Sequence, residues 1–125
     1  MLADYAHVGS QSFVRRILTH SDQQCSMYLQ QRLKTTPHEA RKTAIIQAVG
    51  RMLLDLCLSK FGNFLVSRCL EQGGLELAVS WAKALEGHLL ALSLDPFGCH
   101  CVQKLLDCGD RTTKVCGKAY GLVQS

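Results

Sequence analysis

Apolar residues recur along the chain at the three- and four-residue spacing of amphipathic helices, in short segments separated by glycines and polar turns. Thr36 before Pro37, and Asp95 before Pro96, are typical of helix starts. No segment shows the alternation that marks a strand, so the chain is predicted to be all-α. The pattern predicts helices near 10–19, 22–34, 37–50, 52–58, 62–72, 75–85, 87–93, 98–108 and 111–120.

Part of this helical pattern is repeated. Residues 52–74 and 88–110 superpose at an offset of 36 residues without a gap, and nine of the 23 aligned positions are identical. A unit of this size cannot bury its apolar face alone and needs a neighbour to pack against. The sequence therefore predicts an α-solenoid, and the extended surface of such an array favours binding as the class of function.

A third, weaker copy is predicted near the N-terminus. Residues 10–18 align with 62–70 and 98–106, and all three segments share a valine, a basic residue and a leucine at their fifth, seventh and ninth positions. The offset from this copy to the next is 52 residues, which makes the stretch from Cys25 to Ala48 an enlarged helical connection. We therefore expect a degenerate first repeat with this connection over 1–51, a repeat over 52–87, and a repeat over 88–125 that is incomplete at its C-terminus, as in a truncated array.

The two clear copies carry a polar face opposite the apolar one. On a helical wheel that starts at Asn63 or Cys99, the first and fifth positions lie side by side and the second projects beyond them. Phe64 and His100 occupy the second position. A planar group flanked by two polar groups can stack an unpaired base and contact its edge. The candidate RNA-binding residues are Asn63, Phe64, Ser67 and Arg68 in one copy, and Cys99, His100, Gln103 and Lys104 in the other.

Each of these residues also has an ordinary structural explanation. A single surface aromatic such as Phe64 more often packs against a neighbouring helix, and Arg68 alone would be a solubilising charge. The recurrence of the whole set after 36 residues favours a shared role. Arg68 and Lys104, both at the sixth position, would favour a polyanion.

The segments FGNFLVSRCLEQG and LSLDPFGCHCVQKLLDCGD resemble the repeat of the Pumilio/PUF family of RNA-binding proteins. The resemblance implies a right-handed α-solenoid of stacked three-helix repeats, in which five residues of the second helix contact one base. It implies single-stranded RNA as the partner, in particular messenger RNA under post-transcriptional regulation. A footprint of two or three bases would require further repeats or protein partners.

The resemblance also implies a role for each residue. Cys99 and Gln103 would contact the base edge while His100 stacks, a combination similar to the family's adenine-reading repeats. Asn63 would be an edge contact and Phe64 a stacking group. Ser67 stands where the family usually has glutamine, which leaves the preferred base of that copy open.

Composition narrows the classes of function. The net charge of +4 is compatible with a nucleic-acid partner without indicating one strongly. No run reaches the roughly 20 apolar residues of a membrane span and the N-terminus lacks a secretory signal, so we expect a cytoplasmic protein without a membrane partner. The seven cysteines are expected to be reduced thiols, and the helical neighbours Cys99, His100 and Cys101 cannot converge on one ion. No metal or cofactor is predicted.

Two other classes of protein remain open from the residues alone. A protein-interaction scaffold of the armadillo or HEAT kind would share the stacked helices and is the alternative to RNA binding. An enzyme is disfavoured, because no nucleophile is paired with a base and an oxyanion site.

Overall fold

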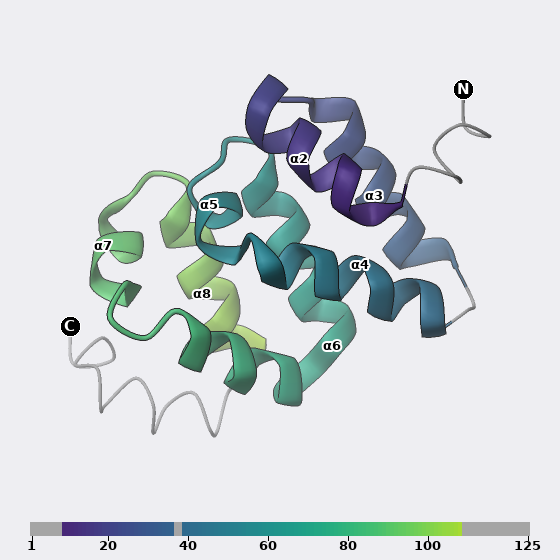
Figure 1. The fold of residues 1–125 in the computed structure, drawn as a ribbon. Helices are drawn as coiled ribbons and strands as arrows, with labels where there is room; N and C mark the ends of the chain where they lie inside the picture. Colours follow the sequence, from purple (N-terminus) through teal and green to yellow (C-terminus); the bar gives the residue numbers. More distant parts are fainter. Residues whose placement is uncertain (1–8, 37–38, 109–125) are drawn as a thin grey trace.

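The computed structural model describes residues 9–36 and 39–108. Within these ranges the chain forms helices joined by short turns (Figure 1). The predicted helix over 111–120 lies outside the described residues. The helices are α2 (Ser10–His20), α3 (Gln23–Thr35), α4 (Glu39–Arg51), α5 (Leu53–Cys57), α6 (Gly62–Ala84), α7 (Leu89–Leu94) and α8 (Gly98–Cys108).

The long helix α6 is two helices joined at a kink. Gly74 has φ 68° and ψ −152°, a conformation that glycine adopts without the steric cost other residues would meet. The sequence predicts separate helices over 62–72 and 75–85, and the break at Gly74 agrees with that division. The second half of α6 can therefore fold back beside other helices while the first half continues the array.

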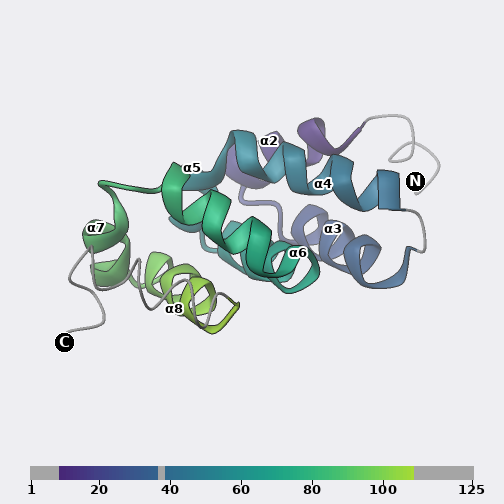
Figure 2. The ribbon, with the colours of Figure 1, turned by 90° about the horizontal axis from the view of Figure 1, so that it is seen from below.

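The helices form three successive units: α2, α3 and α4; α5 with the two halves of α6; and α7 with α8. Helix α3 packs along α6, and α6 packs along α8. In Figure 2, α8, α6 and α3 follow one another from left to right. One hydrophobic core runs through all three units, and its largest fully buried side chains include Ile17, Leu29, Leu33, Leu56, Leu65, Leu70 and Leu92. The described cysteines are all free thiols.

Helices α3, α6 and α8 begin with the same kind of hydrogen bond. The side chain of Asp22 accepts from the Cys25 backbone N–H at 3.0 Å, and that of Ser59 accepts from the Gly62 N–H at 3.0 Å. Asp95 accepts from the backbone N–H of the residue three positions later at 2.8 Å. These caps satisfy donors that a helix start leaves unpaired. They lie 37 and 36 residues apart and therefore identify α3 as the counterpart of α6 and α8.

This register differs from the one that the predicted third copy implies. The copy over 10–18 falls in α2, which forms the outer side of the first unit and hardly touches α6. The stretch from Cys25 to Ala48, predicted as an enlarged helical connection, contains most of α3 and α4, and we propose that these are the second and third helices of that unit. The valine, basic residue and leucine that the three segments share fit the period of an amphipathic helix, and in α2 Phe13, Val14 and Ile17 are turned to the core.

Two glycines allow α6 and α8 to begin against the short helix before them. Gly62 and Gly98 are both buried. A Cβ atom on Gly98 would lie 2.8 Å from the carbonyl oxygen of Leu92, and one on Gly62 would lie 2.9 Å from that of Leu56. The close contact fixes how each short helix sits on the longer helix that follows it.

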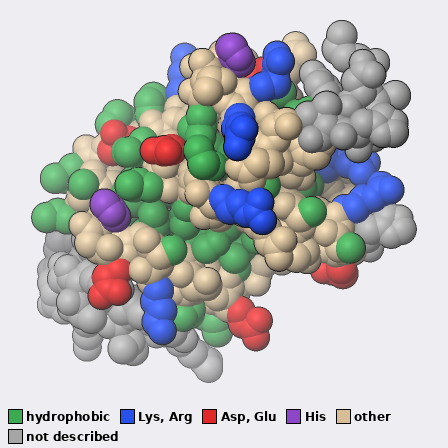
Figure 3. Space-filling model, viewed as in Figure 1, with side chains coloured by type: hydrophobic (Ala, Val, Ile, Leu, Met, Phe, Trp, Pro, Cys, Tyr) green, Lys and Arg blue, Asp and Glu red, His purple; other side chains and the backbone are tan. Residues whose placement is uncertain are grey.

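Charge is unevenly divided between the units. Residues 10–51 contain seven lysines and arginines against two acidic residues, whereas residues 52–108 contain four against six. On the face shown in Figure 3, Lys and Arg side chains lie mostly over the half formed by α2 to α4. None of the helices in the described ranges has the length and apolar character needed to cross a membrane.

Candidate nucleic-acid interface

A groove between α6 and α8 gathers seven of the eight residues predicted to contact RNA. We call it the α6–α8 groove, and it encloses about 300 Å³. Phe64 is 55% exposed and His100 is also exposed, so both planar side chains face the groove from neighbouring helices. Cys99 is half-buried and does not line the groove, and its thiol lies 3.5 Å from the Pro96 carbonyl oxygen. The lining residues are Asn63, Phe64, Ser67, Arg68, Glu71, His100, Gln103, Lys104 and Asp107.

Asn63 differs from its expected position on the exposed face. Its side chain is buried at the floor of the groove with 1% exposure. The amide nitrogen donates to the carbonyl oxygens of Ser59 and Lys60, both at 2.8 Å, and this anchors the residue under the preceding turn. Its Oδ1 has no partner among the described residues. A buried unpaired acceptor costs about 1–3 kcal/mol, a cost that a donor in the groove would relieve.

Glu71 joins the two basic residues of the groove. Its carboxylate accepts from Arg68 at 3.0 Å in its own unit and pairs with Lys104 of the next unit at 2.8 Å. The hydrogen bond from Lys104 lowers the pKa of Glu71, and the bond from Arg68 acts in the same direction. The bridge therefore contributes to stability above the ordinary pKa of a glutamate and is lost as the pH falls through the lowered value. At neutral pH it neutralises charge that would otherwise attract a polyanion.

Polar side chains with unused hydrogen-bonding capacity line the rest of the α6–α8 groove. The Gln103 amide nitrogen donates to Asp107 at 3.1 Å, a bond that does not use its amide oxygen, which can act as an acceptor. Ser67 contributes a single half-buried hydroxyl. The two fifth positions thus offer different chemistry to the edge of a base.

A second groove, which sequence reasoning missed, lies between α3 and α6. This α3–α6 groove encloses about 240 Å³. In the register set by the helix caps, Ser26, Met27 and Gln30 correspond to Asn63, Phe64 and Ser67. The exposed fraction of Met27 is 59%, close to that of Phe64. The lining residues are Met27, Gln30, Gln31, Leu33, Lys34, Arg68 and Gln72.

Hydrogen bonds hold the α3 segment in this register. Ser26 is buried like Asn63, and its hydroxyl donates to the Phe61 carbonyl oxygen at 2.7 Å. Gln30 donates to the same hydroxyl oxygen at 3.0 Å, so the first and fifth positions are joined. The Asp22 cap, directly before α3 and three residues before the buried Cys25, is the sequence signal that could have located this segment.

A family model described as "Pumilio-family RNA binding repeat" matches residues 53–77 and 88–115. The chain is 39% identical over 94 residues to "Meiotic coiled-coil protein 2" of Schizosaccharomyces pombe, with 75% of this chain and 13% of that protein covered. It is 33% identical to "Meiotic PUF family protein 1" of the same organism, covering 77% of this chain and 16% of the relative. It is 34% identical to "Pumilio homolog 1" of Xenopus laevis, covering 69% of this chain and 7% of that protein.

Solved structures show the same arrangement of helices. The Puf4 RNA binding domain bound to the HO endonuclease RNA 3′ UTR recognition sequence has a TM-score of 0.64 at 29% identity, covering 70% of this chain and 27% of that one. A Puf4 mutant bound to the Cox17 RNA 3′ UTR recognition sequence has a TM-score of 0.67 at 28% identity, covering 76% of this chain and 28% of the mutant's chain. The predicted repeat solenoid is thereby confirmed. The chain spans only a small part of the length of each relative.

Proposed function

Because the chain belongs to the Pumilio/PUF family of RNA-binding, non-enzymatic repeat proteins, we propose that it binds single-stranded RNA with one base at each unit. The proposed partner is cytoplasmic messenger RNA, and the proposed process is its post-transcriptional regulation. The observation that carries the proposal is the recurrence of Met27, Phe64 and His100 as exposed side chains beside two equivalent grooves. Their spacings, 37 and 36 residues, equal those of the helix caps.

In this proposal each base stacks against the residue at the second position and presents its edge to the residue at the fifth. The first positions contribute less, because Ser26 and Asn63 are buried and Cys99 does not line the groove. Stacking is worth about 1–3 kcal/mol per base and tolerates any base, because every base has a π-face. Met27 would replace the aromatic plane with a polarisable thioether. Hydrogen bonds at the edge then discriminate between bases. The Gln103 amide offers both a donor and an acceptor, whereas the Ser67 hydroxyl is shorter, so we expect sharper selectivity at α8 than at α6.

The substitution Gln103→Glu tests the proposed edge contact. A carboxylate only accepts hydrogen bonds, so bases that present an acceptor to this position should lose affinity relative to bases that present a donor. We expect about a tenfold change in relative preference at one RNA position, the equivalent of roughly one good edge contact. Fluorescence anisotropy with four labelled RNAs that differ at that position measures the preference.

The matched control is Gln47→Glu, the same change on the exposed side of α4 and outside both grooves. It should leave the order of the four RNAs unchanged. An identical order for the wild-type chain and both variants would reject the edge contact. Failure of the wild-type chain to bind any RNA at low salt would favour the protein-interaction scaffold.

Glu71→Gln is expected to strengthen RNA binding and make it more sensitive to salt. The substitution releases Arg68 and Lys104 from a carboxylate that now pairs with both. Each released cation that meets a phosphate adds about 0.7 to the slope of log affinity against log salt concentration for a single strand. Anisotropy titrations at several salt concentrations measure this slope.

Glu76→Gln controls for the change in net charge. Glu76 is exposed on the second half of α6 and lines neither groove. Equal salt slopes in the two variants would mean that the Glu71 bridge does not limit access of RNA to Arg68 and Lys104.

A further inference from the structure

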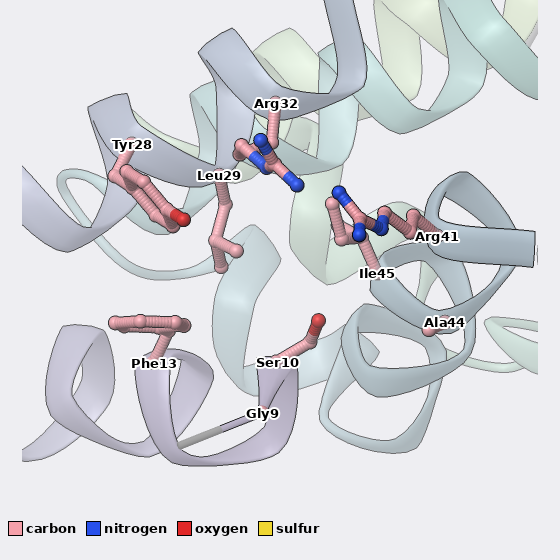
Figure 4. A pocket seen from close by; sticks show the side chains of 9 residues that line it. All are labelled: Gly9, Ser10, Phe13, Tyr28, Leu29, Arg32, Arg41, Ala44 and Ile45. Atoms are coloured by element: carbon pink, nitrogen blue, oxygen red, sulfur yellow. The ribbon is translucent and has the colours of Figure 1, made fainter. Parts of the chain in front are cut away.

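A pocket of about 210 Å³ lies between α2, α3 and α4, among the side chains of the first unit. Figure 4 shows how its residues are arranged. Phe13, Leu29 and Ile45 contribute apolar walls, and the Phe13 ring meets the Tyr28 ring at a centroid distance of 5.2 Å. The pocket is distinct from both grooves, because none of its lining residues lines either of them.

Two arginines converge in this pocket. The guanidinium groups of Arg32, from α3, and Arg41, from α4, point toward one another, and the Ser10 hydroxyl points into the space below them (Figure 4). Two like charges turned toward each other repel unless an anion lies between them. A guanidinium pair with nearby hydroxyl donors matches the geometry of a phosphate group.

The acidic residues of the first unit do not neutralise these arginines. Over residues 10–51 the acids are Asp22 and Glu39. Asp22 pairs with Arg16 and caps α3, while Glu39 pairs with Lys42. No ion pair among the described residues involves Arg32 or Arg41. Within residues 9–36 and 39–108, the pocket is therefore a local concentration of positive charge without an acidic partner.

Arg32 differs in chemistry from its counterpart in the second unit. In the register of the helix caps Arg32 corresponds to Cys69 of α6, a thiol with 0% exposure in the core of the second unit. Arg32 is half-buried. The first unit thus places a guanidinium on the face where the second unit is packed with apolar groups. Packing alone does not call for a charge at this position.

The start of α2 adds to the positive potential. Gly9 and Ser10 line the pocket, and Gly9, the N-cap of α2, supplies no side-chain hydrogen bond to the helix. The N–H groups of an 11-residue helix therefore begin at the pocket, and such a helix end favours an anion. From the convergent arginines, their lack of acidic partners and this helix start, we propose that the pocket is a binding site for a phosphate group.

The test uses the 125-residue chain and inorganic phosphate, measured by isothermal titration calorimetry and by NMR shifts of the Gly9 and Ser10 amides. We expect saturable binding that moves these amides. Arg41→Gln should weaken it about tenfold or more, since a hydrogen bond to a charged group is worth roughly that factor. Arg51→Gln, an exposed arginine of α4 outside the pocket, should change the affinity less than about twofold.

Binding measurements with two RNAs of different length identify the source of the phosphate. One RNA is just long enough to fill both grooves, and the other is extended by several nucleotides at either end. If the pocket takes a phosphodiester of the bound strand, Arg41→Gln weakens only an extended RNA. If it takes free phosphate, the variant loses phosphate binding and keeps the affinity for every RNA.

The phosphate arm does not require RNA binding, so failure of the proposed RNA function leaves this inference testable. Equal phosphate affinity of Arg41→Gln and Arg51→Gln would overturn the site. So would the absence of saturable phosphate binding by the wild-type chain. Arg32→Gln is the second pocket variant, and thermal melting of each variant separates loss of binding from loss of folding.

Discussion

Replacing Phe64 with alanine is expected to weaken binding of single-stranded RNA by about 1–3 kcal/mol, roughly five- to 150-fold. The ring is 55% exposed and lines the α6–α8 groove, so the change removes a stacking surface rather than part of the core. The loss should be similar for all bases at that position, because stacking does not depend on the hydrogen-bonding edge. Anisotropy titrations with labelled RNA at fixed salt measure it.

Leu90→Ala is the matched control for Phe64→Ala. Leu90 is a large apolar residue of α7 with 67% exposure, and it lies outside both grooves. This variant should bind RNA like the wild-type chain, and both variants should keep the wild-type melting temperature. Unchanged RNA affinity of Phe64→Ala would remove the second position from the proposed contacts.

Gly98→Ala is expected to lower the free energy of unfolding by about 1–3 kcal/mol, the usual range for overpacking. The added methyl group would lie 2.8 Å from the Leu92 carbonyl oxygen and 2.9 Å from the Leu92 Cδ2. The side chain could rotate away, but the carbonyl belongs to the backbone of α7 and can move only with that helix. Urea unfolding followed by circular dichroism measures the change.

Thr43→Ala supplies the reference for this stability prediction. Thr43 is exposed in α4, where an alanine is expected to change the free energy of unfolding by less than about 0.5 kcal/mol. A Gly98→Ala variant as stable as the wild-type chain would show that α7 does not rest closely on the start of α8 in solution.

The similarity of the second and third units could be predicted because both sequences keep a glycine where a helix start contacts the short helix before it. Gly62 and Gly98 recur where the helix starts meet the preceding helix, and the apolar positions after them recur in step. The first unit has Cys25 at this position, so it lacks the glycine that marks the other two. Its similarity lies in the capping residue Asp22, which can be read from the sequence, and in the burial pattern, which becomes visible only when the helices are seen packed.

The burial of Asn63 could not be predicted from a helical wheel. A wheel assigns faces within a helix but takes no account of the turn that precedes it. Asn63 stands in the first turn of α6, where its amide nitrogen reaches back to two carbonyl groups of that turn. Phe64, at the neighbouring second position, is not held by these hydrogen bonds, and its ring is exposed as the wheel predicts.

Arg68 borders both the α3–α6 and the α6–α8 grooves. If the two grooves take neighbouring nucleotides, as proposed, a side chain shared in this way would make the two sites thermodynamically dependent on each other, because its orientation toward one nucleotide would change what it offers to the next. Transplanting a single unit into another array would therefore not carry a self-contained specificity with it. Double-mutant cycles across the two grooves should give coupling energies different from zero, and the recognition code of this protein would have to be written for pairs of neighbouring bases.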